Sequence, residues 1–323
     1  MNNILDIICY PLGKFLLFIY NTIAFHNYGL ALLAFTFFVK LVLLPLTVKQ
    51  YKSSAKMQEL QPLIQEVQKR YKNDKEKLNQ EMMKVYQENN YNPAGGCLPM
   101  LVQMPILISL YWVIMQPLKF LLMKNTEQIT KLVDVATKAL GASKMGFQKE
   151  LATLNYFNEN KDALSQVTGI LNPNELINFN FIGLHLGKIA SYSLDVIKSD
   201  PAVYLPLLIL PILAVITTFI STKLSMPKTT PNSTGQNAMA SSMTNSMLYI
   251  GPVMTLIFSF QLPAGVVLYW SAGYVFQIFQ QLYINKHILK KHLPVEVKAI
   301  SDKNGPNNNK GQITKKKEAA RKK

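Results

Sequence analysis

Five blocks of apolar residues set the expected architecture of this chain. They cover residues 28–49, 97–118, 202–223, 246–262 and 266–285. An α-helix rises about 1.5 Å per residue, so roughly 20 residues cross a hydrocarbon core of about 30 Å. Each block therefore predicts a transmembrane helix. The fold class expected is an all-α polytopic membrane protein with a five-helix transmembrane core.

Residues 1–27 are also apolar, but one side of the helical wheel is polar. The polar side collects Asn3, Asp6, Tyr10, Gly13, Lys14, Tyr20 and Asn21. This pattern predicts an amino-terminal amphipathic helix lying in the membrane interface. A first membrane span is the alternative interpretation. A secretory signal is disfavoured because no Lys or Arg precedes the apolar run.

Residues 50–92 form a soluble stretch in which apolar positions recur at helical spacing. One stripe holds Leu60, Leu63, Ile64 and Val67, and the other Leu78, Met82, Val85 and Tyr86. Two such stripes predict a helical hairpin, with Asn73 as the N-cap of its second helix. Its methionines, Met57, Met82 and Met83, offer an adaptable contact surface, although methionine in a helix pair more often serves plain packing.

The charges of the connecting segments predict the orientation. Residues 50–92 are basic, and the linker at residues 224–245 contains Lys228 and no acid. The tail, residues 286–323, contains twelve Lys or Arg and three acids, whereas residues 119–201 are nearly neutral. The positive-inside rule then places the hairpin, linker and tail in the cytoplasm. The amino terminus lies outside and residues 119–201 form an extracytoplasmic loop, in which Ile129, Leu132, Val133, Ala136 and Leu140 predict a short helix.

The overall composition agrees with a membrane protein and gives no sign of an enzyme. The chain of 323 residues is 49% hydrophobic and carries a net charge of +16. Its two cysteines, Cys9 and Cys97, have no ligand-like spacing, so we expect no metal site and no disulfide framework. Neither HExxH nor a phosphate-binding loop occurs, and the four histidines lie in connections or at span ends. We therefore expect no cofactor and no bond-making chemistry.

One charge lies inside a predicted span. Lys40 falls near mid-depth of residues 28–49, where a lysine costs roughly 2.5–3.5 kcal/mol on insertion scales. Snorkelling is the alternative, but Lys49 is nine residues away, about 13 Å, and a lysine side chain reaches about 6 Å. No Asp or Glu occurs in any predicted span. The sequence therefore predicts that Lys40 meets water, lipid phosphate or a substrate carboxylate.

Uncharged polar residues mark the other predicted spans. Gln103 lies in the second, and Thr217, Thr218, Ser221 and Thr222 gather near the end of the third. On the fifth, Trp270, Tyr274, Gln277 and Gln281 share one helix face. This face could form interhelical hydrogen bonds or could line a wet cavity. Both interpretations remain open at this point.

Three stretches resemble the YidC/Oxa/Alb family of membrane protein insertases. They read TFFVKLVLLPLTVKQYK from Thr36, QEMMKVYQENNYNPAGGCLPMLVQMPI from Gln80 and LPAGVVLYW from Leu262. The block NPxGGCxPxxxQxPI and the later P-x-G turn occur in order and at family-like spacing. The resemblance covers nearly the whole chain except residues 124–175 and the tail. Within the family, the chain resembles the short bacterial members that lack a large periplasmic domain.

The resemblance implies five helices around a hydrophilic groove that is open to the cytoplasm and to lipid and closed outside. Lys40 matches a family position that is usually arginine, so the charge is kept and the bidentate geometry is lost. The third span departs from many relatives, which carry Gln before Lys in the region of Ser221 and Thr222. The expected groove residues are Lys40, Thr36, Gln103, Trp270, Gln277, Ser221 and Thr222.

The resemblance also implies function, partners and location. It predicts an insertase and chaperone in the bacterial cell membrane, which acts on nascent membrane proteins with the ribosome, the Sec translocon and the signal recognition particle pathway. The basic tail would bind ribosomal RNA or anionic lipid through Lys315, Lys316, Lys317, Arg321, Lys322 and Lys323. An assembly chaperone that acts only beside the Sec translocon is an alternative. An ion-coupled transporter is disfavoured, because no second Lys or acid occupies a matching span.

Overall fold

A computed structural model describes residues 4–92, 98–225, 237–284 and 286 of this chain, which are mostly helical. Cys97, residues 226–236 of the linker and the whole tail beyond Lys286 lie outside the described residues. The chain divides into two compact units. The larger contains Met1–Gln58 and Asn92–Leu293, and the smaller contains Glu59–Tyr91 and Pro294–Lys323.

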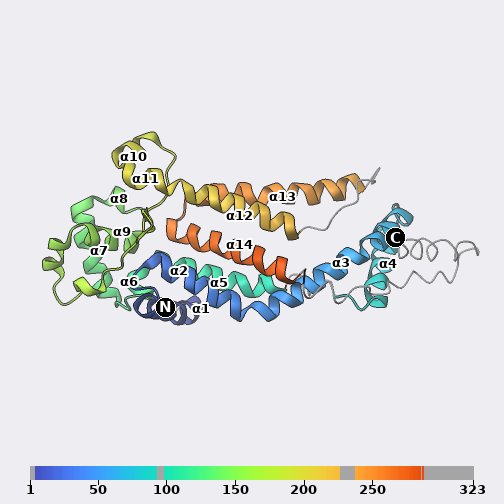
Figure 1. Ribbon diagram of the computed structural model, residues 1–323, viewed down its shortest axis with the longest axis horizontal. Coiled ribbons are helices and arrows are strands. Elements are labelled where there is room, and N and C mark those ends of the chain that lie inside the picture. The colour runs from blue at the N-terminus through green and yellow to red at the C-terminus, as the bar shows by residue number, and fades with distance from the viewer. Residues whose placement is uncertain (1–3, 93–97, 226–236, 285, 287–323) are drawn as a thin grey trace, which may run out of the picture. The chain divides into compact units, whose positions relative to one another are not determined.

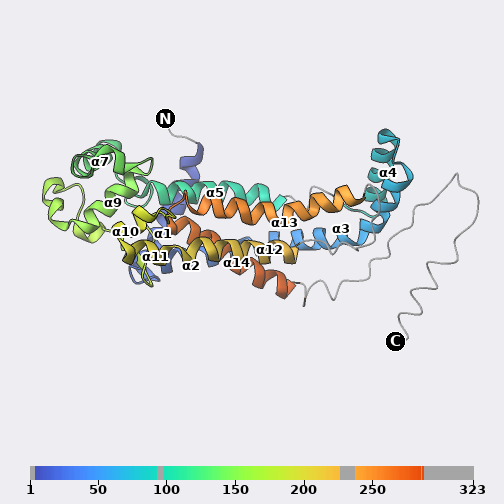
Figure 2. The same ribbon diagram turned by 90° about the horizontal axis from the view of Figure 1, so that it is seen from above.

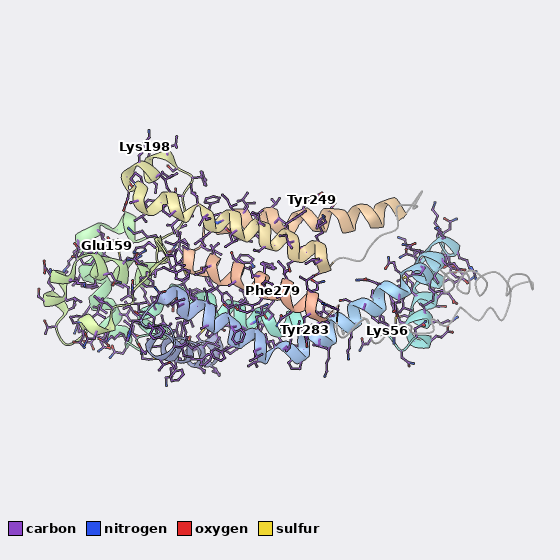
Figure 3. All side chains as sticks on the ribbon, viewed as in Figure 1. Lys56, Glu159, Lys198, Tyr249, Phe279 and Tyr283 are labelled. Atoms are coloured by element: carbon purple, nitrogen blue, oxygen red, sulfur yellow. The ribbon has the colours of Figure 1, made fainter. Side chains whose placement is uncertain are left out.

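A layered bundle of helices makes up most of the larger unit. Figure 1 shows α12 and α13 side by side above α14, with α2 and α5 below it. The bounds of these helices are Tyr28–Val42 for α2, Leu98–Met115 for α5, Ile209–Ser225 for α12, Asn237–Ser259 for α13 and Ala264–Ile284 for α14. All five overlap the apolar blocks of the sequence. Large apolar side chains of the bundle also face outward, among them Tyr249 on α13 and Phe279 on α14 (Figure 3).

By length and composition, one helical segment of the described residues can cross a membrane alone. It is Pro201–Ser225, which combines α11 (Pro201–Leu207) and α12. A second candidate is α2 together with α3 (Leu44–Arg70), which are bent by 61° at Leu43. The apolar parts of α5 and α13 are shorter, Val102–Met115 and Leu248–Ser259.

The amino-terminal helix α1 (Ile4–Thr22) runs across the direction of the bundle. It is seen nearly end on in Figure 1 and from the side in Figure 2. It packs against α2 and α5, and its buried side includes Cys9, Leu16 and Ile19. Gly13 lies so close to the backbone of Phe120 that a Cβ atom at Gly13 would collide with the Phe120 carbonyl. This close approach fixes α1 against α6 (Pro117–Phe120), the short helix that follows α5.

Residues 117–207 form a compact lobe, which we call the loop domain. Its hydrophobic core includes Leu132, Leu154 and Phe157, which are fully buried. The predicted helix around Leu132 is confirmed as α7, with a capping box between Asn125 and Gln128. Its elements, apart from α11, are α6 (Pro117–Phe120), α7 (Thr126–Leu140), α8 (Ala142–Met145), α9 (Lys149–Glu159), η2 (Lys161–Val167), η3 (Pro173–Glu175), β1 (Asn180–Phe181), β2 (Leu184–His185) and α10 (Leu194–Ser199).

The smaller unit contains the end of α3 and the helix α4 (Lys75–Glu88). The apolar stripes of both helices supply its buried apolar residues, which are Leu60, Ile64, Val67 and Val85. The predicted N-cap is wrong by one residue. Asp74, not Asn73, has the extended backbone of a cap, and its carboxylate accepts a hydrogen bond of 3.0 Å from the N–H of Lys77.

Candidate functional site

Lys40 lies in the last turn of α2, just before the bend at Leu43. Its backbone carbonyl accepts a hydrogen bond of 3.3 Å from Nε2 of Gln280 on α14. Its side chain is half-buried. Among the described residues, no carboxylate lies within ion-pair distance of the Lys40 ammonium. The charge therefore enters the bundle without a protein counter-ion from the described part of the chain.

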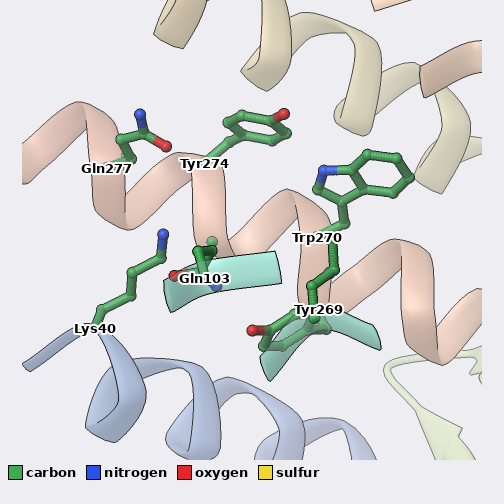
Figure 4. A pocket seen from close by; sticks show the side chains of 8 residues that line it. Lys40, Gln103, Tyr269, Trp270, Tyr274 and Gln277 are labelled. Atoms are coloured by element: carbon green, nitrogen blue, oxygen red, sulfur yellow. The ribbon is translucent and has the colours of Figure 1, made fainter. Parts of the chain in front are cut away.

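The Lys40 side chain lines a cavity of about 150 Å³ between α2, α5 and α14. The Lys40 side chain extends from α2 toward α14, the helix that carries Gln277 (Figure 4). A cavity of this size with several polar walls has room and partners for water. The lining residues are Lys40, Gln103, Leu107, Tyr269, Trp270, Gly273, Tyr274 and Gln277.

One stripe of α14 supplies most of this lining. Tyr269, Trp270, Gly273, Tyr274 and Gln277 are spaced by three or four residues, so they share one face of the helix. Gly273 faces the lysine side chain, since a Cβ atom there would lie in ordinary van der Waals contact, 3.7 Å from Cε of Lys40. The Trp270 indole is stacked on a ring of α13, that of Phe258, at 6.5 Å between ring centroids. The cavity wall is thus held by α13 as well as by α14.

Three of the expected groove residues are not among those that line this cavity. Thr36 is buried, and its hydroxyl donates a hydrogen bond of 2.7 Å to the Leu32 carbonyl of its own helix. Ser221 is buried on α12, and Thr222 lies half-buried beside it. In contrast, Lys40, Gln103, Trp270 and Gln277 come together from three helices.

The sequence left two interpretations open for the polar face of α14, a wet cavity and interhelical hydrogen bonds. Different residues of this face show each of them. Gln277 lines the cavity. Gln281 lies one turn further on and forms interhelical hydrogen bonds, donating to the carbonyl of Leu224 and accepting from the hydroxyl of Ser225 on α12. The contact between α12 and α13 is polar too, because the hydroxyls of Thr218 and Thr255 lie 3.4 Å apart.

The sequence analysis did not single out Leu107, Tyr269 or Gly273 as cavity residues. Leu107 follows Gln103 by one helical turn, and Tyr269 and Gly273 adjoin Trp270 and Tyr274 on α14. Helical spacing from the polar residues could therefore have identified them. Leu107 and Gly273 carry no polar group that would mark them in the sequence, which explains why these two were missed.

The remaining candidate residues lie elsewhere in the chain. Met57 is half-buried on α3 in the larger unit, whereas Met82 and Met83 lie on α4 in the smaller unit. Met83 has an exposed side chain. The six basic tail residues, Lys315 to Lys317 and Arg321 to Lys323, lie outside the described residues. No group of three or more His, Cys, Asp or Glu within the described ranges could hold a metal ion.

Comparison with known proteins identifies a family. A family model described as 60Kd inner membrane protein matches residues 18–291. A membrane protein insertase YidC of Oceanobacillus iheyensis is 33% identical over 270 residues, which cover 82% of this chain and 77% of that relative. Membrane protein insertase YidC 2 of Bacillus anthracis is 32% identical over 85% of this chain and 78% of its own length.

A longer relative matches over a similar part of this chain. Membrane protein insertase YidC of Histophilus somni strain 2336 is 32% identical over 288 residues, or 89% of this chain. These residues are 38% of that relative, so the chain spans little more than a third of its length. Residues 18–291, which the family model matches, include the helices that supply Lys40, Gln103 and Gln277.

Proposed function

The chain belongs to the YidC/Oxa family of membrane protein insertases, the 60Kd inner membrane protein family, and we propose that its cavity around Lys40 receives the polar segments of nascent membrane proteins. The observation that carries this proposal is a lysine inside an apolar helical bundle that faces a polar cavity, with no carboxylate partner among the described residues. Intramembrane charges normally pair or face water within the protein. The missing partner here would be the incoming chain.

We propose five spans at residues 28–49, 97–118, 202–223, 246–262 and 266–285. The amino terminus and residues 119–201 would lie outside, and the hairpin, linker and tail in the cytoplasm. Lys and Arg placement supports this orientation. The apolar segment Pro201–Ser225 supports the third span, and the transverse course of α1 supports an interfacial helix at residues 1–27. The bend at Leu43 would change the direction of the first span, and α3 would continue from its end toward the cytoplasmic hairpin.

In this mechanism, the hydrophilic extracytoplasmic segment of a substrate enters the groove beside Lys40, while its apolar helix moves into lipid along the first and third spans. Gln103 and Gln277 would bind uncharged polar groups of the passing chain. The ammonium of Lys40 would attract acidic groups, and its long-range attraction is strong because the surrounding protein has a low dielectric constant. Water in the cavity would keep the lysine charged between substrates.

The hydrophobic effect supplies the driving force. Burial of apolar surface releases about 25 cal/mol per Å², so a helix of roughly 20 apolar residues gains enough to carry a short polar segment across. No nucleotide and no cofactor are required. The protein would lower the barrier to insertion by offering polar groups within the membrane, and it would make and break no covalent bond.

The segments on the cytoplasmic side would recruit the substrate. Met57, Met82 and Met83 would contact the apolar helix of a nascent chain through flexible side chains. The basic tail would dock on ribosomal RNA or anionic lipid. We propose that the ribosome and the signal recognition particle pathway deliver substrates, and that the protein acts alone or with the Sec translocon.

The rival function is an assembly chaperone that acts only beside the Sec translocon. Reconstitution of the pure protein into liposomes, followed by addition of a single-span substrate, separates the two. Protease protection of the translocated segment in these liposomes would support an autonomous insertase. Protection that requires added Sec translocon would assign the chain to the chaperone role. Empty liposomes measure spontaneous insertion and serve as the control.

A further inference from the structure

Residues 177–192, which we call the strap, cross the ends of two helices of the bundle. Near its start, the carbonyl of Asn178 accepts a hydrogen bond of 3.2 Å from the N–H of Tyr28, the first residue of α2. Near its end, the carbonyls of Leu186 and Lys188 accept hydrogen bonds of 2.9 and 2.8 Å from the N–H groups at the start of α14. The strap is therefore fixed to both helices through the backbone.

Side-chain contacts reinforce the fixed position at α2. Asn27 donates a hydrogen bond of 3.0 Å from Nδ2 to the carbonyl of Asn180. Phe181 packs on Gly29, where a Cβ atom would lie only 2.2 Å from its ring. The phenol of Tyr20 accepts a hydrogen bond of 2.9 Å from the N–H of Asn178. The β1–β2 hairpin thus cannot shift without breaking contacts to α1 and α2.

The strap and its neighbour present large apolar side chains to the outside. Ile182, at the tip of the β1–β2 hairpin, is 85% exposed. Phe25, in the connection between α1 and α2, is 84% exposed, and Tyr192, at the other end of the strap, is 78% exposed. An apolar residue at a hairpin tip or loop corner would ordinarily be replaced by a polar one, because exposure there gains nothing in water.

The backbone at two of these positions is also unfavourable. Ile182 has φ 49° and is followed by Gly183 at φ 77°, in a two-residue hairpin connection that favours Asn-Gly. A β-branched residue with positive φ is an outlier. Phe25 also has φ 49°. The fold therefore holds two apolar side chains outward in a backbone conformation that L-residues disfavour.

We propose that Ile182, Phe25 and Tyr192 anchor the strap in the interfacial region of the outer lipid leaflet. The proposal rests on the proposed spans, because α2 then begins at the outer surface of the membrane. Phe25 precedes α2 by only three residues, so it lies close to the same surface. Tyrosine is enriched at this boundary in membrane proteins.

Continuity with the surface of the bundle identifies lipid as the occupant. Along α2, the exposed side chains Leu30, Phe37 and Leu41 continue the apolar surface that starts at Phe25. Tyr192 lies against Phe260, with ring centroids 5.4 Å apart, at the end of α13. The outward side chains of α13 continue the apolar surface from there. The strap would thus mark where the lipid-facing surface of the bundle ends.

Fluorescent labelling of single cysteines tests this anchor. The background carries Cys9→Ala and Cys97→Ala, and an environment-sensitive NBD probe is attached at Ile182→Cys or Phe25→Cys in liposomes of phosphatidylcholine and phosphatidylglycerol. The control is Lys138→Cys, an exposed position on α7, which lies at the far end of the loop domain from α2 and α14 (Figure 1). We expect blue-shifted emission and quenching by a shallow nitroxide lipid at positions 182 and 25, and neither at 138.

Emission at 182 and 25 that matches the control would overturn the anchor. A blue shift without quenching by the nitroxide lipid would also overturn it, because protein would then cover the strap. The readout needs no insertion activity, so an inactive insertase with quenched probes would contradict the proposed function alone.

Ile182→Asn provides a second test, which distinguishes a lipid anchor from a purely structural role of Ile182. Asn-Gly is the preferred pair for this hairpin turn, so the substitution relieves the backbone while it removes the apolar side chain. We expect unchanged or higher thermal stability in detergent together with weaker lipid quenching of a probe at Phe25→Cys. Unchanged quenching would show that Ile182 does not contribute to the anchor.

Discussion

The backbone carbonyl of Lys40 accepts a hydrogen bond from Gln280, and this contact joins α2 to α14 at the cavity. Because the tie uses the backbone of Lys40, the side chain is left to extend toward α14, the helix that carries Gln277 (Figure 4). The backbone of Lys40 thus joins the two helices, whereas its side chain brings the charge into the cavity. A substitution of the side chain can therefore remove the charge without removing the hydrogen bond between the two helices.

Gly29→Ala should destabilise the protein. A Cβ atom at this position would lie 2.2 Å from the ring of Phe181, and the surrounding hydrogen bonds of Asn27 and Tyr28 prevent the strap from moving away. Overpacking of this kind costs about 1–3 kcal/mol, so the melting temperature in detergent should fall. The matched control is Gly251→Ala on α13, where the nearest atom would lie 3.8 Å away. Equal melting temperatures for the two variants would contradict the packing of the strap.

Glu150 should make the stability of the loop domain depend on pH. Burial raises the pKa of Glu150 to about 7, although the backbone N–H groups of Lys119 and Leu118 and the Lys119 charge, itself paired with Asp6, act in the opposite direction. The folded pKa exceeds the ordinary value of 4.5, so the stabilisation is fully present below that value and is lost as the pH rises through about 7. Across this pH range the free energy of unfolding should fall by at most about 3 kcal/mol.

The matched variant is Glu150→Gln, which keeps a hydrogen-bond acceptor and cannot ionise. We expect it to raise the melting temperature at about pH 8 and to leave it nearly unchanged at about pH 5. The same increase at both pH values would mean that burial of the ionised form of Glu150 is not responsible.

The proposed orientation can be checked by thiol labelling of intact cells. A cysteine at Ser143 in the loop domain should react with an impermeant reagent added outside, and a cysteine at Gln236 in the linker should not. Permeabilised cells, in which both positions should react, control for accessibility. Labelling of Gln236→Cys but not Ser143→Cys in intact cells would reverse the topology.

Truncation after Leu293 distinguishes the two proposed roles of the basic tail. Contacts to ribosomal RNA phosphates are strongly salt-dependent, so the truncated protein should co-sediment less with ribosomes at low salt while it remains in the membrane. Neutralisation of the six basic residues from Lys315 to Lys323 within the full-length chain is the matched control. Ribosome binding equal to that of the intact protein would assign the tail to anionic lipid.

The apolar pattern was sufficient to predict most helices of the bundle, because burial and lipid exposure both require long apolar segments. The bend at Leu43 was missed, although Pro45 stands two residues further on, in the first turn of α3, where a proline favours a break in the preceding helix. The loop domain was also underestimated. The helix at Leu132 was found from its spacing, but α9 and the β1–β2 hairpin depend on contacts with distant segments such as Asn27.

The candidate site was predicted in part for a similar reason. Lys40, Gln103 and Gln277 are polar residues in apolar helices, and this contrast is visible in the sequence. Whether a polar side chain faces a cavity or a neighbouring helix depends on tertiary packing. Thr36 illustrates the limit, because its hydroxyl is bonded to Leu32 within its own helix. Spacing alone could not separate it from Lys40 one turn later.

The central claim concerns the charge of Lys40, and its most direct test is the insertion rate of Lys40→Leu in liposomes. A charge-assisted contact contributes about 1.5–3 kcal/mol, so insertion of a substrate with an acidic translocated segment should slow roughly tenfold or more. A neutral segment should be affected little, and Lys40→Arg should restore the acidic substrate. Equal protein levels and unchanged or higher detergent stability control for misfolding, because removal of a buried charge does not weaken the bundle. If Lys40→Leu inserts acidic and neutral substrates at wild-type rates, the electrostatic role of this cavity is contradicted.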